Sequence, residues 1–303
     1  MSSIFIQISS YRDKELRPTI LDAIERSSGK HQLYFGIHVC YLDKSEIDIP
    51  DIKNIRWIAS KAPENIGVGI GRYLAHKFYN DEDYYLQCDS HMRFVQDWDE
   101  IAVNSILNYQ THGIEKPLLT MYPANYFYKD ESFQEITKVT INSDYRTTIS
   151  FHKDPEEFKK SRIPSQTAMP LKEGIFTRSI SAGSVFTVGP FIEPNKDMAF
   201  WGEEIMMAAR AYTHGYDLVV PSTQYLYHLY FNQKNIKINR REHVWIDFPK
   251  EYEISNIKSR AIVYKTLVEG TVGDGYLGSS RTIEEYGVFA GLDFLNGNVI
   301  ENC

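Results

Sequence analysis

A carboxylate and an imidazole lie one residue apart at Asp89 and His91, directly after the mostly apolar run at 84–88. Alternate residues of an extended chain face the same side, so both side chains can point at one metal ion. In open α/β sheets ligands bind at the carboxyl ends of strands, where this pair is expected to lie. A carboxylate with an imidazole suits Mn²⁺ better than Ca²⁺, and Mg²⁺ also fits. The alternative is a surface turn, in which Asp and Ser are common.

Three alternating glycines, Gly67, Gly69 and Gly71, precede Arg72 and a helix-like segment. Glycines at a helix start let a phosphate approach the backbone, and the helix dipole attracts the anion. The spacing differs from the dinucleotide fingerprint G-x-G-x-x-G, which follows a strand directly. Asp89 nevertheless lies where a ribose-binding acid is expected, so an NAD-dependent dehydrogenase is one alternative. A loop that only packs tightly on a strand is another.

Two adjacent acids, Glu203 and Glu204, follow Trp201 at the start of an expected helix. The helix dipole alone favours acids in a first turn. The functional alternative is a carboxylate beside Trp201 that binds sugar hydroxyls or transfers a proton. His228 lies in an aromatic run, which suits either a core histidine or a ligand. The sequence has no G-x-S-x-G motif, so it gives no support for a serine hydrolase.

The elements that must position these residues alternate between strand-like and helix-like segments. Strands are expected at 4–8, 33–42, 55–58, 84–89, 118–122, 181–188, 217–220 and 224–231. Helices are expected at 17–28, 67–79, 97–109 and 202–211, with two more in the tail. This alternation predicts an α/β protein with a mainly parallel central sheet flanked by helices.

Local signals suggest where several helices begin and end. Pro18 suits a first helical turn, Gly29 a C-terminal cap and Asp97 an N-terminal cap. The run from Thr282 to Glu285 matches a capping box. Sequence at about 129–174 is polar and irregular. We therefore predict one domain over 1–303, comprising a donor-binding half (about 1–125), a variable insertion (about 129–174) and an acceptor-binding and catalytic part with the tail (175–303).

Composition excludes several classes of protein. The 303 residues carry 33 basic and 40 acidic side chains, a net charge of −7, which disfavours nucleic acid and anionic membranes as general partners. No apolar run approaches the ~18 residues of a membrane span. The run at 4–8 is also short for the ~7–15-residue core of a signal peptide. Cys40, Cys88 and Cys303 are widely spaced, which suggests reduced thiols. We expect a cytoplasmic protein with no transmembrane segment.

Seven short motifs together are more specific than any one of them. They are Ser9-Ser10-Tyr11-Arg12-Asp13, Tyr84-Tyr85-Leu86-Gln87-Cys88-Asp89-Ser90-His91-Met92-Arg93-Phe94, Ser181-Ala182-Gly183, Phe200-Trp201-Gly202-Glu203-Glu204, Ala208-Ala209-Arg210, His214-Gly215-Tyr216-Asp217 and Tyr227-His228-Leu229-Tyr230. This combination resembles the GT-A-fold family of UDP-GlcNAc-dependent polypeptide transferases, whose eukaryotic members modify hydroxyproline in the cytoplasm. The resemblance covers about 3–232 and extends weakly to 284–294.

The resemblance implies a GT-A (Rossmann-like) fold and a metal-dependent, retaining glycosyltransferase with UDP-GlcNAc as donor and a hydroxyl acceptor on a polypeptide or glycan. The implied ligands of Mn²⁺ (or Mg²⁺) are Asp89, His91 and His228. The implied donor-binding residues are Ser10, Tyr11, Arg12, Arg72, Asp89, Ser90 and Trp201. The implied catalytic residues are Glu203 and Glu204. Successive helical residues point ~100° apart, so we expect these two acids to have different roles.

Several points stay open at this stage. The region at 129–170 departs from the eukaryotic relatives, so a polypeptide, a glycan and a lipid-linked sugar all remain acceptors, and UDP-GalNAc remains a donor. Retention requires a carboxylate nucleophile or same-face attack assisted by the leaving phosphate, and we favour the latter because no single acid is marked as a nucleophile. Arg72 is expected to serve the nucleotide and not the fold. A non-catalytic sugar-nucleotide- or protein-binding module of the same fold is the alternative from another class.

Overall fold

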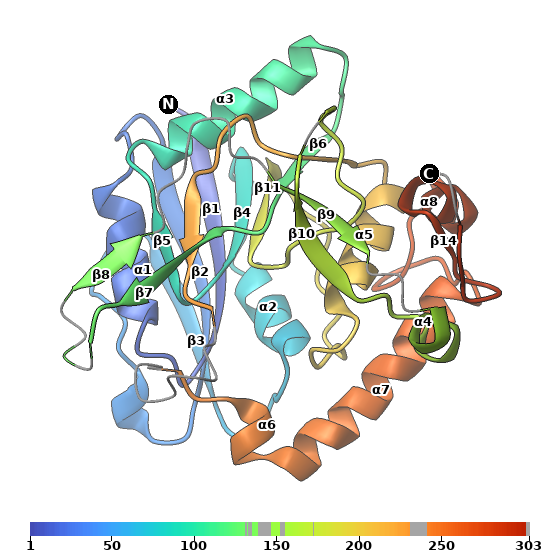
Figure 1. Ribbon diagram of the computed structural model, residues 1–303. Helices are drawn as coiled ribbons and strands as arrows, with labels where there is room; N and C mark the ends of the chain where they lie inside the picture. The colour runs from blue at the N-terminus through green and yellow to red at the C-terminus, as the bar shows by residue number, and fades with distance from the viewer. Residues whose placement is uncertain are drawn as a thin grey trace.

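A seven-stranded sheet forms the centre of the molecule in the computed structural model, which describes residues 1–130, 132, 135–138, 147–151, 155–171, 173–230 and 241–300. The strand order is β12-β6-β11-β4-β1-β2-β3 (Figure 1). The strands are β1 (Ser3–Tyr11), β2 (Gln32–Tyr41), β3 (Ile55–Lys61), β4 (Tyr84–Asp89), β6 (Pro117–Thr120), β11 (Ser184–Val188) and β12 (Asp217–Val219). Only β11 runs antiparallel to its neighbours, so the predicted α/β class with a mainly parallel sheet is confirmed.

Helices cover both faces of this sheet. Strand β1 has apolar side chains on both sides, and each side must be buried against a helix. Ile4, Ile6 and Ile8 belong to a hydrophobic cluster that includes side chains of α1 (Leu16–Glu25) and α3 (Trp98–Thr111). Phe5 belongs to a second cluster on the other face, together with α5 (Glu203–Thr213). Alternating side chains of a strand point to opposite faces, and a near-continuous apolar run is typical of a parallel strand covered on both sides. Helix α2 (Val68–His76) also packs on β1 and β2.

A smaller sheet lies beside the carboxyl ends of the central strands. Its order is β5 (Met92–Phe94), β13 (Leu226–His228), β7 (Ala124–Tyr128) and β8 (Ile136–Lys138). The strand expected at 224–231 is therefore shorter and belongs to this second sheet, and Phe231 lies outside the described residues. Because β13 pairs with β5, His228 lies opposite Met92, next to His91.

Part of the segment expected to be irregular is folded. It contains β9 (Thr147–Phe151), α4 (Pro155–Ser161) and β10 (Gln166–Pro170), and β10 pairs antiparallel with β9. The expected C-terminal cap at Gly29 is wrong, because α1 ends at Glu25 with Arg26 as its C-cap. Asp97 is the N-cap residue of α3, as predicted, although its side chain makes no capping hydrogen bond.

The described part of the tail contains helices and a final hairpin. In chain order they are α6 (Val244–Asp247), α7 (Pro249–Leu267), α8 (Ile283–Ala290), β14 (Leu292–Asp293) and β15 (Asn298–Val299). The short 3₁₀ helix η1 (Lys44–Glu46) lies earlier in the chain, between β2 and β3. The predicted capping box before α8 is confirmed, since the Glu285 amide donates to the Thr282 hydroxyl at 3.1 Å and the Thr282 amide to the Glu285 carboxylate at 2.6 Å.

No helix among the described residues is long and apolar enough to cross a bilayer. Cys40 and Cys88 are free and buried, and Cys303 lies outside the described residues.

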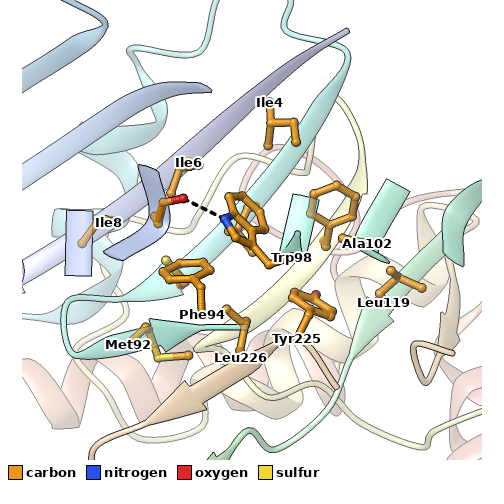
Figure 2. Packing of buried hydrophobic residues seen from close by; sticks show 14 of the residues in the cluster. Ile4, Ile6, Ile8, Met92, Phe94, Trp98, Ala102, Leu119, Tyr225 and Leu226 are labelled. Carbon is orange, nitrogen blue, oxygen red and sulfur yellow. Dashed lines mark hydrogen bonds between the residues drawn. The ribbon is translucent and has the colours of Figure 1, made fainter. Parts of the chain in front are cut away.

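Trp98 anchors the segment that leads from β4 into α3. Its ring packs 4.9 Å from that of Phe94 among Ile4 and Ile6 (Figure 2), and its indole N–H donates to the Ala23 carbonyl at 2.8 Å. The hydroxyl of Thr19 on α1 lies 2.8 Å from the Ser90 carbonyl oxygen and accepts the Met92 amide at 2.9 Å. Core packing and this hydrogen bonding therefore fix the turn that carries Asp89 and His91.

We expect Trp98→Ala to lower the free energy of unfolding by about 3–5 kcal/mol, because it leaves a large cavity under the sheet. Urea denaturation measures this change. Leu107→Ala is the matched control, since Leu107 lies on the same helix with 45% of its surface exposed. The control should change stability by only about 0.5 kcal/mol. Equal effects of the two substitutions would contradict the anchoring role of Trp98.

Candidate active site

A cavity of about 650 Å³ opens at the carboxyl ends of β1 and β4. Its walls also include residues of the 155–170 segment, the start of α5 and the segment at 241–245. The implied site residues that line it are Ser10, Tyr11, Arg72, Asp89, Ser90, His91, Trp201, Glu203, Glu204 and His228. Thus the tertiary structure brings together residues from almost the whole chain.

Asp89, His91 and His228 form a cluster that can hold a metal ion. Their ligand atoms all lie within 4.8 Å of one another. The Nε2 atoms of His91 and His228 are 3.0 Å apart, and Nε2 of His228 is 3.2 Å from Oδ2 of Asp89. This convergence follows from the topology, because Asp89 ends β4 and His228 ends β13 of the neighbouring sheet.

Several features around the cluster favour a divalent cation, although Nε2 of His91 also contacts the guanidinium of Arg241. Nδ1 of His91 lies 2.7 Å from the buried carboxylate of Asp13, an arrangement that directs Nε2 toward the other two ligands. Burial lowers the pKa of His228 to about 4, so its ring is neutral at pH 7 and can offer a lone pair. Although burial opposes it, the hydrogen bond with His228 and the charge of Arg72 lower the pKa of Asp89. One carboxylate and two imidazoles form a donor set for Mn²⁺ or a similar ion.

Arg72 forms ion pairs with two acids of the cavity wall. Its side chain is 3% exposed, and its guanidinium lies 2.5 Å from Oε1 of Glu203 and 3.0 Å from Oδ1 of Asp89. The charges of these acids raise the pKa of Arg72, even though burial alone would lower it. These ion pairs also give Arg72 a structural role, because its charge compensates the buried carboxylate of Glu203 and the partly exposed carboxylate of Asp89, whereas its expected contact with the nucleotide stays a prediction.

The glycines before Arg72 have a packing role. The amides of Val68 and Gly69, at the start of α2, donate to the carbonyls of Ala199 and Met198 at 2.7 and 2.9 Å. A Cβ atom at Gly69 would lie 2.4 Å from the Asn195 carbonyl oxygen. The interpretation of this loop as a phosphate cradle is therefore wrong for these two amides, and tight packing explains the glycines. The same contacts remove the main support for an NAD-binding site.

The carboxylate of Glu204 accepts hydrogen bonds from three donors, whereas Glu203 pairs with Arg72. Its Oε1 accepts the Ala182 amide at 3.0 Å, and its Oε2 accepts the Tyr122 hydroxyl at 3.1 Å and the Gln166 side-chain amide. Burial raises the pKa of Glu204 to about 7. The two adjacent acids therefore have different partners, as the ~100° rotation between successive helical residues requires.

Sequence reasoning did not single out Tyr122 and Gln166 as site residues. Gln166 lies within the segment expected to be a variable insertion, and no motif marks it. Asp13 was also missed as a partner of His91, although it ends the motif that begins at Ser9. Its neighbours in that motif already pointed to the site.

Tyr11 and Arg12 meet the start of the tail. Asp247 on α6 accepts the Tyr11 hydroxyl at 2.8 Å and pairs with Arg12 at 2.6 Å. Arg12 also pairs with Glu46 at 2.8 Å, and it is not among the residues that line the cavity. The structure therefore places Arg12 in an ion-pair network that holds α6 over the end of β1. Sequence analysis missed one wall of the cavity. This wall is formed by Arg241 and His243, which precede α6, and by Trp245 within α6.

We expect Arg72→Leu to lower the free energy of unfolding of the ligand-free protein by about 3–5 kcal/mol, because it leaves buried charge uncompensated. Arg17→Leu is the matched control, since Arg17 lies on α1 and its pair with Asp48 is largely exposed. The control should lose at most about 1 kcal/mol. Urea denaturation gives both values, and a loss below that of the control would show that Arg72 has no structural role.

The sequence matches the family described as Glycosyltransferase (GlcNAc) over residues 3–50 and 43–296. No curated protein matches it. The structure is similar to the crystal structure of S. aureus TarS 1-349 in complex with UDP-GlcNAc, with a TM-score of 0.44, 9% identity and coverage of 97% of this chain and 72% of that chain. It is also similar to the crystal structure of GalNAc-T7 with UDP, GalNAc and Mn²⁺, with a TM-score of 0.45, 12% identity and coverage of 77% of this chain and 45% of that chain.

Proposed function

Because the chain belongs to the Glycosyltransferase (GlcNAc) family, we propose that it is a metal-dependent, retaining transferase of the GT-A type. The proposed reaction moves GlcNAc from UDP-GlcNAc to a hydroxyl group of a polypeptide or glycan. The observation that carries this proposal is the convergence of Asp89, His91 and His228 beside Glu204 in a cavity of about 650 Å³. That volume is within the usual range for small-molecule sites, roughly 300–1,000 Å³.

The proposed donor site combines the metal ligands with groups at the ends of β1 and β4. A divalent cation held by Asp89, His91 and His228 would neutralise the charge that develops on the departing UDP. Ser10 is a good candidate to bind the donor, because its buried hydroxyl has no hydrogen-bond partner among the described residues. Ser90 instead donates to Asp13 at 2.7 Å, which stabilises the carboxylate that orients His91.

Arg72 contributes to the proposed site through other side chains. Because it is buried against Asp89 and Glu203, its charge helps to lower the pKa of Asp89 and opposes the rise that burial causes in the pKa of Glu203, and its hydrogen bonds hold both carboxylates in place. Trp201 lies at the cavity wall and is 36% exposed, so its ring remains available to a sugar or acceptor. The structure thus supports positioning roles for Arg72 and Glu203 and a contact role for Trp201.

Glu204 is the acid we assign to the chemical step. In same-face attack the bond between the sugar and UDP breaks while the acceptor oxygen bonds to the same carbon, so positive charge develops on the sugar and the acceptor hydroxyl must give up its proton to a base such as the leaving phosphate or a carboxylate. An ionised carboxylate can stabilise that charge or accept that proton. A pKa of about 7 leaves Glu204 partly protonated at neutral pH, so either role improves as pH rises through this value.

We predict that UDP binding requires the cation and its ligands. Calorimetric titration of UDP should give at least ~100-fold weaker binding with EDTA than with Mn²⁺, and Asp89→Asn should bind equally weakly in both. Asp48→Asn is the control, because Asp48 is largely exposed and does not line the cavity. Equal affinity of the unaltered protein under both conditions would refute the metal assignment.

We predict that Glu204→Gln slows hydrolysis of UDP-GlcNAc, a side reaction that needs no acceptor, by at least ~100-fold. UDP affinity should stay unchanged, because the lost interaction belongs to the transition state. In the unaltered protein the turnover should rise with pH through about 7 and then level off. The variant should lack that rise.

Glu284→Gln is the control for this experiment, since Glu284 occupies the first turn of α8 as Glu204 does in α5. Glu203→Gln should mainly lower the melting temperature, because Arg72 loses a buried partner. If Glu204→Gln retains full turnover, the carboxylate has no part in the chemical step and the catalytic assignment is wrong.

A further inference from the structure

Arg241 lies beside the candidate metal ligands and presents a positive charge to them. Its Nη1 atom contacts Nε2 of His91, the atom that would also bind the cation. Nε2 of His228 is only 3.0 Å from that same atom of His91. Arg241 also lines the cavity, although no motif in the sequence marks it. The guanidinium therefore lies where the cluster would hold its metal ion.

The contact between Arg241 and His91 uses the electron pair that a metal ion would use. Nδ1 of His91 lies 2.7 Å from the Asp13 carboxylate, so the neutral ring carries its proton on Nδ1 and donates it there. Nε2 then has a lone pair, which accepts an N–H of Arg241. A metal ion binds imidazole through this same lone pair. Since Nε2 has one lone pair, the two contacts exclude each other.

Arg241 has no acidic partner in the part of the chain that the structure describes. Asp13 and Asp89, the acids that contact the cluster, pair instead with His91 and with Arg72 and His228. Nε of Arg241 is buried and has no hydrogen-bond partner among the described residues. A divalent cation and an uncompensated guanidinium repel each other strongly at such short range. We therefore expect the site to hold both only when an anion lies between them.

The backbone around Arg241 is held in place, so its side chain alone has to move. Residues 13 and 241 form an antiparallel β-bridge. Further along the chain, Asp247 accepts the Tyr11 hydroxyl at 2.8 Å and pairs with Arg12 at 2.6 Å. Both attachments are to the end of β1 or to the residues that follow it. A change of rotamer can therefore turn the guanidinium from His91 toward a ligand in the cavity while these contacts persist.

A diphosphate is the anion that suits this position. The planar guanidinium offers several N–H donors that match phosphate oxygens, and a divalent cation also binds such oxygens. Sites for phosphoryl groups commonly combine a metal ion with an arginine in this way. The proposed donor, UDP-GlcNAc, carries a diphosphate, and in this respect the inference rests on the proposed function.

We propose that Arg241 keeps the divalent cation from His91 until the diphosphate of the donor is present. The diphosphate attracts the guanidinium away from His91, and the lone pair of Nε2 then binds the cation. The cation and UDP therefore bind cooperatively, because each favours the arrangement that the other requires. The cation site is completed only together with the donor.

Arg241→Gln should change two affinities in opposite directions. Mn²⁺ alone, followed by the electron paramagnetic resonance of the free ion, should bind at least ~10-fold more tightly, since the guanidinium no longer competes for His91. UDP, titrated calorimetrically at saturating Mn²⁺, should bind at least ~10-fold more weakly, since a charge-assisted contact is lost. A purely structural role of Arg241 would weaken both.

Arg241→Met, which keeps the length of the side chain, should give the same pair of changes. Arg17→Gln is the matched control, because it removes one positive charge from a largely exposed ion pair outside the cavity. It should leave both affinities unchanged. Mn²⁺ affinity that is equal or lower in both Arg241 variants would overturn the inference.

Asp89→Asn distinguishes that result from failure of the proposed function. If Asp89→Asn abolishes Mn²⁺ binding while the Arg241 variants do not tighten it, the metal site is supported and only the role of Arg241 is wrong. If Asp89→Asn binds Mn²⁺ like the unaltered protein, the metal site itself is wrong, and the inference fails with it.

Discussion

The guanidinium of Arg72 forms ion pairs with the buried carboxylate of Glu203 and the partly exposed carboxylate of Asp89, and the arrangement of the site depends on this ion triad. Burying a carboxylate without compensation costs several kcal/mol. Arg72 comes from α2, Asp89 from the end of β4 and Glu203 from the start of α5, so the triad ties three elements together at 2.5 and 3.0 Å. The candidate metal ligands and Glu204 are placed relative to this fixed group.

The other buried acids of the cavity are also compensated, each by its own hydrogen-bond partners. Asp13 is compensated by His91 and Ser90, and Glu204 by donors from Tyr122, Gln166 and the Ala182 backbone. These donors compensate the charge of Glu204 only in part, so burial still raises its pKa. Since each acid has its own partners, the two neighbouring acids of α5 have different surroundings, and burial raises the pKa of both.

The second sheet explains how residues far apart in sequence reach one point. Strand β13 pairs with β5, and this pairing brings His228 to His91. Thr19 holds the turn between β4 and β5 from the side of α1. The α6 segment is fastened to β1 through Asp247, and this contact closes one wall of the cavity.

The sequence alone determined the alternation of strands and helices, the capping box at Thr282 and the pairing of Asp89 with His91, because these depend on neighbours within a few positions. Only the tertiary structure decided that Arg72 is a buried ion partner and that Gln166 contacts Glu204. Gln166 lies 38 positions from Glu204, and Asp247 lies 235 positions from Arg12. No local pattern specifies such contacts, since they form only after the sheets have packed and each buried charge has found its partner.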